Sequence, residues 1–420
     1  MISKIKKRIC VVGLGYVGLP LLLMFLKKKY EVYGFEIDKK KIDLLKKKKS
    51  YINDISDKEL KKLKKNNLYH KNFSKIKECD YIIYTLPTPI NNYKPDLKDY
   101  KKSIIDTFRY LKKEQTLIFE STVYPGATEE LFLNQLKKKF EVGKNLYLAY
   151  SPERIDPGNA KNKRFKINNT TKLVSGYSKK CLSKITKIYS AVFKNIYKCN
   201  SIKEAECAKV YENTFRYINI SFVNEFKIMS QKLNIDYNDV IKASSTKQFG
   251  FIPFQPGPGI GGHCIPVDPF YLDWISKKNN CYPHMINASK VVNAKLNFWL
   301  LKQIKKNIVN DKKILVVGLS YKKNINDLRN SPGLSIFKKM LKLYKKKEIR
   351  YHDPYVSLVN IGKKKIRSVE NIEKIKFDTA IIFTDHDIIN FEIIFKNCKK
   401  ILDTRNVSIK EELKKKVIYI

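Results

Sequence analysis

The residues whose types and spacing could do chemistry are concentrated between positions 249 and 274, which read FGFIPFQPGPGIGGHCIPVDPFYLDW. This stretch holds one cysteine in its middle, Cys264, and an aspartate four residues later, Asp268. A loop that glycines make permissive and prolines make rigid is suited to placing one side chain. A thiol placed in this way is a candidate nucleophile, because the thiolate is the reactive form, whereas the alternative is a packed structural cysteine. The glycines of the loop are Gly257, Gly259, Gly261 and Gly262.

A second set of polar residues lies upstream, where Lys209 and Asn213 stand four positions apart in a helical pattern. At that spacing the two side chains share one face of a helix. With Cys264 and Asp268 they form a set suited to oxidation at carbon. The cysteine adds to an aldehyde, the lysine and the asparagine stabilise the developing oxyanion, and the aspartate acts as a base or positions water. The alternative is that the lysine and the asparagine are solvated helix residues, and the sequence alone does not bring them to the cysteine.

A glycine motif near the N-terminus predicts a bound dinucleotide. Gly13, Gly15 and Gly18 form G-x-G-x-x-G, with Tyr16 and Val17 between the last two glycines. The motif follows a β-branched run and opens an apolar helical stretch, which is the context that gives it meaning. The next strand ends in an acid, Glu36, where a carboxylate hydrogen-bonds a ribose 2′-hydroxyl and favours NAD over NADP. The alternative is a turn without a ligand.

The elements that must position these residues alternate between strands and helices, which predicts an α/β fold with parallel sheets. The predicted strands lie at 8–12, 31–38, 81–87, 116–122 and 146–152, and again at 312–322, 348–354, 379–385 and 399–405. Between them, residues 201–233 and Met285–Ile308 show helical periodicity only. We therefore predict two Rossmann-like doubly wound domains, 1–200 and 311–420, joined by a central all-helical segment with a long helix, 201–310.

The second α/β domain carries only a partial glycine fingerprint. Gly318 lies in VVGLSYK, and we find no later glycines that match the first motif. One interpretation is a plain α/β turn. The other is a nucleotide-handling domain in which Lys322, Arg329 and Arg405 meet phosphate, since arginine suits bidentate contact with phosphate.

Composition excludes several classes of protein. The net charge is +45, from 85 Lys+Arg against 40 Asp+Glu, but the lysines are spread along the chain, which favours a solvated surface over nucleic acid binding. The eight cysteines form no C-x-x-C pair, which argues against a zinc site and a disulfide framework and for a reducing cytosol. The five histidines do not indicate a metal site. No apolar run approaches the roughly 20 residues that span a bilayer, and we reject a signal peptide at the N-terminus.

The chain resembles the UDP-glucose/GDP-mannose dehydrogenase family over essentially its whole length. The resemblance is carried, in order, by GLGYVGLPL, LPTPIN, ESTVYPGATEE, SPERIDPGN, EAECAKVYENT, PGPGIGGHCIPVDPFYL, GLSYKKNINDLRNSP and LDTR. It is most similar to the branch that acts on UDP-N-acetylglucosamine and UDP-N-acetylgalactosamine in capsule and O-antigen synthesis. The glucose-oxidising branch usually has lysine before the aspartate, where this chain has Val267.

The resemblance implies a four-electron oxidation of C6 of the sugar by NAD, through a thiohemiacetal and a thioester on Cys264. It implies that Lys209 and Asn213 hold the oxyanion and that Asp268 assists water. The further residues that it implies are Thr122 and Glu153 for water and deprotonation, Gly13, Gly15, Tyr16, Val17, Gly18, Glu36, Thr88 and Thr122 for the cofactor, and Glu153, Arg154, Lys209, Asn213, Gly261, Lys322, Arg329 and Arg405 for the substrate.

The expected protein is thus a cytoplasmic homodimer, paired through the long helix, that oxidises a UDP-N-acetylhexosamine, with UDP-GlcNAc favoured and UDP-GalNAc next. We expect no metal, no nucleic acid and no membrane among its partners. The alternatives are a UDP-glucose or GDP-mannose 6-dehydrogenase, or a non-catalytic protein that binds nucleotide sugars or nucleic acid.

Overall fold

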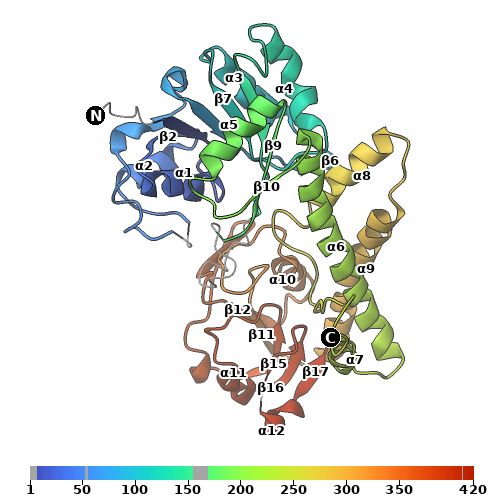
Figure 1. Cartoon of the computed structure of the whole chain (residues 1–420). Coiled ribbons are helices and arrows are strands. Elements are labelled where there is room, and N and C mark those ends of the chain that lie inside the picture. The colour runs from blue at the N-terminus through green and yellow to red at the C-terminus, as the bar shows by residue number, and fades with distance from the viewer. Residues whose placement is uncertain (1–6, 53–54, 155–168, 409) are drawn as a thin grey trace. The chain divides into compact units, whose positions relative to one another are not determined.

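The computed structural model describes residues 7–52, 55–154, 169–408 and 410–420 (Figure 1). The chain forms two compact units. The first comprises Met1–Glu212 with Phe270–Cys281, and the second comprises Asn213–Pro269 with Tyr282–Ile420. The boundaries of the three predicted domains stay a prediction, since the two units divide the central segment between them.

The first unit is built on an eight-stranded sheet, drawn in blue to green in Figure 1. In spatial order its strands are β10 (Ile196–Lys198), β9 (Lys172–Gly176), β8 (Tyr147–Tyr150), β7 (Thr116–Phe119), β4 (Tyr81–Tyr84), β1 (Arg8–Val12), β2 (Glu31–Glu36) and β3 (Leu68–His70). The six strands from β3 to β8 are parallel and follow the chain order 3-2-1-4-5-6 of a dinucleotide-binding fold. β9 is antiparallel to β8, and the sequence did not predict it or β10.

Helices cover both faces of this sheet, because successive side chains of a strand point to opposite sides. Ile83 of β4 joins a core with α1 and α5, whereas Tyr84 stacks on Phe119, which stacks on Phe132 of α4. The helices of the unit are α1 (Gly18–Lys27), α2 (Lys39–Lys46), α3 (Lys98–Phe108), α4 (Ala127–Lys137) and α5 (Lys179–Tyr189). The smaller elements are η1 (Lys65–Asn67), η2 (Ser74–Glu78), β5 (Ile90–Asn91) and β6 (Lys94–Pro95).

The second unit contains a five-stranded parallel sheet, drawn in orange to red in Figure 1. Its strands in spatial order are β12 (Glu348–His352), β11 (Lys313–Val317), β15 (Phe377–Ile382), β16 (Cys398–Asp403) and β17 (Val417–Tyr419). Their chain order is 2-1-3-4-5, the flavodoxin-like form of a doubly wound sheet, whose ligand site lies where the order reverses. Both predicted α/β domains are confirmed, and the second differs from the first in strand order.

The faces of this second sheet are also covered on both sides. One core joins β11 and β15 to α9 and α10, and the other joins the same strands to α11. The helices are α9 (His284–Asn307), α10 (Pro332–Leu343), α11 (Phe391–Asn397) and α12 (Glu411–Lys414). The smaller elements are the hairpin of β13 (Leu358–Ile361) and β14 (Lys364–Arg367), and η4 (Ile372–Lys374).

The central helices confirm the predicted helical segment. α6 (Ile202–Lys232) has 31 residues, and α7 (Tyr237–Ser244) and α8 (Asp268–Lys278) follow it. The predicted loop is therefore shorter than expected, because Asp268 begins a helix. Among the described residues, no helix is long and apolar enough to cross a membrane.

Candidate active site

The glycine motif forms the tight turn that a dinucleotide requires. Gly13 has a φ of +95°, and a Cβ there would lie 2.8 Å from the carbonyl oxygen of Thr85. A Cβ on Gly18 would lie 1.9 Å from the carbonyl oxygen of Gly13, so this glycine lets helix and loop pack closely. A Cβ on Gly15 would meet nothing within 4 Å, which leaves its backbone open to a ligand. The three glycines thus have the three roles of the fingerprint.

The start of α1 fits the phosphates of the cofactor. No acidic residue lies in the first turn of α1, so nothing there opposes the positive end of the helix dipole. Tyr16 and Val17 are half-buried in the turn that precedes the helix. Backbone N–H groups at such a helix end bind phosphate oxygens. The described residues therefore fit NAD, which supplies a hydride acceptor when bound.

Glu36 has a role that the sequence did not reveal. Its buried carboxylate accepts hydrogen bonds from the backbone N–H of Leu14 at 3.0 Å, of Ile37 at 2.9 Å and of Asp38 at 3.1 Å. Glu36 therefore holds the glycine turn against the end of β2. An ionised carboxylate has about four acceptor positions, so these three bonds leave room for a ribose hydroxyl. The contact with ribose stays a prediction.

Thr88, Thr122 and Glu153 follow three neighbouring parallel strands, β4, β7 and β8. The carboxyl ends of parallel strands meet at one edge of a sheet, which is where ligands bind in such folds. The two threonines are half-buried, and the buried Tyr271 donates to the carbonyl oxygen of Thr88 at 2.8 Å. The structure thus brings these residues to the same sheet edge as the glycine turn.

Arg154, beside Glu153, is held by protein groups. Its guanidinium pairs with Glu212 at 2.7 Å and donates to the carbonyl oxygen of Thr171 at 2.9 Å. The rest of the SPERIDPGN motif, from residue 155 onward, lies outside the described residues. A substrate contact of Arg154 stays a prediction.

A buried ion cluster surrounds Glu153, and sequence reasoning missed it. The Nζ of Lys172 lies 2.9 Å from a carboxylate oxygen of Glu153 and 3.1 Å from one of Glu120. The hydroxyl of Tyr189 donates to the other oxygen of Glu120. Glu120, Lys172 and Tyr189 are each at most 3% exposed. The signal was hidden because Lys172 lies on the antiparallel strand β9, which no pattern predicted.

The second unit brings Asn213 and Asp268 together across 55 positions of the chain. The Nδ2 of Asn213 donates to a carboxylate oxygen of Asp268 at 2.6 Å, and both side chains are buried. Cys264 is half-exposed, and its carbonyl oxygen accepts from the N–H of Val267 and of Asp268, so it immediately precedes α8. Lys209 lies one helical turn before Asn213 in α6 and is 8% exposed. The alternative that Lys209 and Asn213 are solvated is therefore wrong.

The glycine loop packs against the second sheet of its own unit. The N–H of Gly262 donates to the carbonyl oxygen of Arg329 at 2.9 Å, and a Cβ on Gly261 would lie 2.5 Å from the Cβ of Tyr321. A Cβ on Gly257 would lie 2.7 Å from Nη1 of Arg405. The structure therefore brings the cysteine loop to the basic residues that were predicted to bind the nucleotide.

Two of those basic residues have neighbours that restrain them. The exposed Arg329 forms an ion pair of 2.5 Å with Asp327, and the Nε of Arg405 donates to the carbonyl oxygen of Phe383 at 2.7 Å. Lys322 is half-buried. These contacts fix the directions of the two guanidinium groups before any ligand binds, and contact with phosphate stays a prediction.

The second unit repeats the glycine turn of the first more fully than the sequence indicated. Gly318 has a φ of +78°, and a Cβ there would lie 2.4 Å from the carbonyl oxygen of Thr384, much as Gly13 meets Thr85. A Cβ on Gly333 would lie 3.2 Å from the carbonyl oxygen of Gly318, so Gly333 corresponds to Gly18. The interpretation that later glycines were missing is wrong, because a longer loop separates Gly318 from Gly333.

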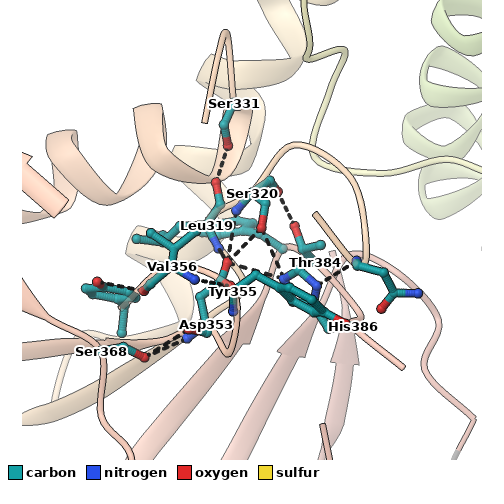
Figure 2. A network of polar contacts seen from close by, with 12 residues as sticks. Leu319, Ser320, Ser331, Asp353, Tyr355, Val356, Ser368, Thr384 and His386 are labelled. Atoms are coloured by element: carbon teal, nitrogen blue, oxygen red, sulfur yellow. Dashed lines mark hydrogen bonds and ion pairs between the residues drawn. The ribbon is translucent and has the colours of Figure 1, made fainter. Parts of the chain in front are cut away.

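In the second unit an aspartate, Asp353, lies at the position that corresponds to Glu36. All of its acceptor positions accept hydrogen bonds from other groups of the protein. Figure 2 shows Asp353 accepting from the N–H of Leu319 at 2.8 Å, from the hydroxyl of Ser320 at 2.9 Å and from His386 at 3.2 Å. Its other oxygen accepts from two further backbone N–H groups. Burial acts to raise the pKa of Asp353, but these donors lower it to about 2. This carboxylate has no free position for a ribose hydroxyl, so Asp353 cannot play the part that is predicted for Glu36.

The described part of the chain has no group of three or more His, Cys, Asp or Glu side chains that could hold a metal ion. All eight cysteines lie in described segments, and none of them forms a disulfide. The two ring nitrogens of His386 have different roles. Its Nδ1 accepts from the N–H of Asn324 at 2.9 Å, and its Nε2 donates to Asp353.

Comparison with known proteins identifies relatives over nearly the whole chain. Models of the UDP-glucose/GDP-mannose dehydrogenase family match in succession, the NAD binding domain over residues 7–193, the central domain over 203–295 and the UDP binding domain over 315–410. The chain is 36% identical over 390 residues to the UDP-N-acetyl-D-glucosamine 6-dehydrogenase of Salmonella typhi, with 90% of each chain covered. It is 38% identical over 345 residues to Protein CapL of Staphylococcus aureus, with 80% of this chain and 79% of that protein covered. The solved structure of the UDP-D-ManNAc dehydrogenase from Pyrococcus horikoshii is similar at a TM-score of 0.82 and 29% identity, with 96% of each chain covered.

Proposed function

Because this chain belongs to the UDP-glucose/GDP-mannose dehydrogenase family and is an NAD-dependent nucleotide-sugar dehydrogenase, we propose that it oxidises C6 of a UDP-N-acetylhexosamine to the carboxylate. UDP-N-acetylglucosamine is the proposed sugar. The observation that carries the proposal is the buried contact of 2.6 Å between Asn213 and Asp268, four residues after the half-exposed Cys264. A buried amide and carboxylate beside a thiol form an arrangement suited to covalent oxidation at carbon.

In the proposed reaction the residues of this chain act in turn. NAD held at the glycine turn would supply the acceptor for a hydride from C6 of the alcohol, and the hydroxyl proton would pass to a base, which leaves an aldehyde. Cys264 adds to the aldehyde as a thiolate and gives a thiohemiacetal. Lys209 and Asn213 stabilise the oxygen that carries the developing negative charge.

The thiol is needed because the second oxidation requires a covalent intermediate. The thiohemiacetal becomes a thioester when its hydroxyl gives up a proton to a base and its carbon gives up a second hydride, for which a second NAD would be the acceptor. Water activated by Asp268, with Thr122 and Glu153 at the neighbouring strand ends, then cleaves the C–S bond. The products are the uronic acid and the free thiol, and two NAD are reduced for each sugar. A role of this product in surface polysaccharide synthesis stays a prediction.

The identity of the sugar rests on the relatives and on one residue. The Salmonella typhi relative is named for UDP-N-acetyl-D-glucosamine, and the Pyrococcus horikoshii structure is named for UDP-D-ManNAc. We favour the gluco sugar because the relative of higher identity carries that name, and the manno sugar is the second candidate. Val267 stands where the glucose-oxidising branch usually has lysine, which disfavours UDP-glucose.

We further propose a homodimer that pairs through exposed apolar side chains of α6 and α9. On α6, Phe215, Phe222 and Met229 lie seven residues apart and are 42%, 65% and 50% exposed. On α9, Val291 and Phe298 lie seven apart and are also exposed. Side chains at this spacing lie on nearly one face of a helix. Exposed apolar side chains that line one face of a helix often mark a protein interface.

The test is NADH formation by the purified protein with a panel of UDP-GlcNAc, UDP-GalNAc, UDP-ManNAc, UDP-glucose and GDP-mannose. The NADH formed is counted for each sugar consumed. Two NADH per UDP-GlcNAc, with much lower kcat/KM for the other sugars, is the expected result. A preference for UDP-ManNAc would change the sugar, one NADH per sugar would contradict the covalent path, and none with any sugar would overturn the proposed function.

A further inference from the structure

We propose that Lys172 and Glu120 are positioning residues for Glu153, so that Lys172 holds the Glu153 carboxylate in place and Glu120 sets how strongly it is held. This inference rests on the proposed function, in which Glu153 assists deprotonation and water. Neither Lys172 nor Glu120 is among the residues that the sequence or the family resemblance indicated.

The geometry forms one buried line of polar groups across the first unit. From the core outward, Tyr189 of α5 donates to Glu120, which follows β7. Glu120 pairs with Lys172 of β9 at 3.1 Å, and Lys172 pairs with Glu153 at 2.9 Å. The second oxygen of Glu153 accepts from the N–H of Arg154 at 2.7 Å. The line therefore ends at the sheet edge that carries the glycine turn.

The cluster carries a charge imbalance that its burial makes important. Two carboxylates share one ammonium, so the fully ionised cluster has a net charge of −1 at a buried site. An unbalanced buried charge is costly, so the cluster tends to take up a proton. Burial raises the pKa of Glu120 to about 6, against the opposing effect of Lys172, and the charge of Glu153 adds to the rise. The two carboxylates raise the pKa of Lys172 against its burial, so Lys172 stays charged.

The two states of this cluster hold Glu153 differently. Above the pH at which the pair takes up its first proton, Lys172 divides its charge between the carboxylates of Glu120 and Glu153. Below that pH Glu120 is neutral, so Lys172 pairs with the Glu153 carboxylate alone and holds it more strongly. The protonation belongs to the coupled pair rather than to one residue.

The described surroundings of the cluster are mainly aromatic. Lys172 also lies over the rings of Tyr189 and Phe193, with Nζ 5.7 Å and 5.2 Å from their centroids. Among the described residues, the titratable groups that interact within the cluster are Glu120, Glu153, Lys172 and Tyr189. Arg154 approaches through its backbone, and its guanidinium is paired with Glu212. Within the part of the chain that the structure describes, the members of the cluster can thus be changed one at a time.

The test is the pH dependence of kcat/KM for the wild type and for Glu120→Gln, Lys172→Met and Lys172→Arg. The inflection on the acid side of this profile reports the pKa of the essential base in the free enzyme. Removing the negative charge with Glu120→Gln is expected to move this inflection to lower pH. Removing the positive charge with Lys172→Met is expected to move it to higher pH, by about 1 unit or more. Lys172→Arg should restore most of the wild-type profile, because it keeps the charge.

A matched control is Glu206→Gln. Glu206 is also a buried carboxylate of the first unit, and burial raises its pKa to about 7, but it accepts from the N–H of Gly126 and of Thr128 at the start of α4. It has no part in the ion cluster, so this variant should leave the acid-side inflection in place. An inflection at the same pH in the wild type, Glu120→Gln and Lys172→Met would overturn the proposal.

A second readout needs no turnover. Difference infrared spectroscopy during acidification is done on the Glu206→Gln protein, because Glu206 itself takes up a proton with a pKa of about 7. A protonated carboxyl C=O band should appear near pH 6 in this protein and be lost when Glu120→Gln is added. If Lys172→Met does not fold, this band decides the question, and its persistence in the double variant contradicts the proposal. If the band appears as expected but the wild type forms no NADH with any sugar, the proposed function is contradicted instead.

Discussion

Three carboxylates of this chain accept hydrogen bonds or pair with charges that their positions in the sequence do not reveal. Glu36 accepts from three backbone N–H groups, and Glu153 pairs with a buried lysine. Asp353 lies at the corresponding position of the second unit, and both of its carboxylate oxygens accept hydrogen bonds from protein groups. A carboxylate at this position therefore has an acceptor position left for a ligand in the first unit and none in the second.

At Cys264 we predict that substitution by serine keeps cofactor binding but abolishes net conversion to the acid. A serine hydroxyl is a far weaker nucleophile than a thiolate near neutral pH, so the acid should form at least about 100-fold more slowly. The measurement is the uronic acid product by mass spectrometry together with NADH per sugar. Cys281→Ser changes an exposed cysteine and is the control. Acid formation at the wild-type rate by Cys264→Ser would rule out the covalent path.

At Glu36 we predict that Glu36→Gln raises the Kd for NAD about tenfold, since hydrogen bonds to charged groups contribute about 1.5–3 kcal/mol. The Kd for NADP should rise less, because the variant removes a negative charge that repels the 2′-phosphate. Titration calorimetry with both dinucleotides measures the two constants. Glu59→Gln, on a partly exposed carboxylate of the same unit, should change neither. An equal rise of the Kd for NAD and for NADP would contradict a contact between Glu36 and the ribose.

At the scale of elements, the two strand–turn–helix units follow one plan with different outcomes. In each, a glycine with positive φ follows the first strand and packs against a threonine carbonyl, and a second glycine lets the next helix approach. The N–H of Gly13 donates to the carbonyl oxygen of Phe35 at 2.8 Å, and the N–H of Gly318 donates to that of His352 at 2.8 Å. The longer loop of the second unit carries Lys322 and Arg329, the residues that were predicted to meet phosphate.

The glycine turn of the first unit predicts different effects for substitutions at Gly18 and at Gly15. Gly18→Ala places a Cβ 1.9 Å from a backbone oxygen, so we expect it to lower the free energy of unfolding by about 2 kcal/mol, as overpacking does. Gly15→Ala meets no atom within 4 Å and should leave stability unchanged. It should instead weaken NAD binding at least about tenfold, because its methyl group occupies the path of the pyrophosphate.

Thermal unfolding without cofactor and calorimetric titration with NAD separate the two effects. Each glycine variant serves as the control for the other. A stable Gly18→Ala protein, or a Gly15→Ala protein that binds NAD as the wild type does, would contradict the roles assigned to the turn.

For the whole molecule, the exposed apolar face of α6 and α9 is the feature that a single chain does not explain. Large aromatic side chains such as Phe222 and Phe298 are 65% and 74% exposed, although the surface is otherwise rich in lysine. A net charge of +45 keeps chains apart by repulsion, so association requires a defined apolar contact.

We predict that the wild type sediments as a dimer at micromolar concentration and that Phe222→Glu sediments as a monomer. A charge buried in the apolar centre of an interface is left without a partner, which weakens association by several kcal/mol. Leu343→Glu, at a site of α10 that is also 65% exposed, is the matched control and should remain dimeric. Identical sedimentation of the wild type and Phe222→Glu would place the interface elsewhere or exclude it.

The sequence by itself determined the α/β units, the long helix and the residue types of the site, because these depend on local patterns. Strand β1, the turn at Gly13 to Gly18 and helix α6 lie where periodicity and glycine spacing predicted them. The motif around Cys264 and the family resemblance indicated the chemistry. All of these signals lie within short stretches of the chain.

Only the tertiary structure decided which distant side chains meet. The contact of Asn213 with Asp268 joins residues 55 positions apart, and Lys172 reaches Glu120 over 52 positions. The correspondence of Gly333 with Gly18 was hidden by the length of the intervening loop. The physical reason is that burial and pairing depend on how the chain packs around each group, whereas composition and periodicity record only its neighbours along the sequence.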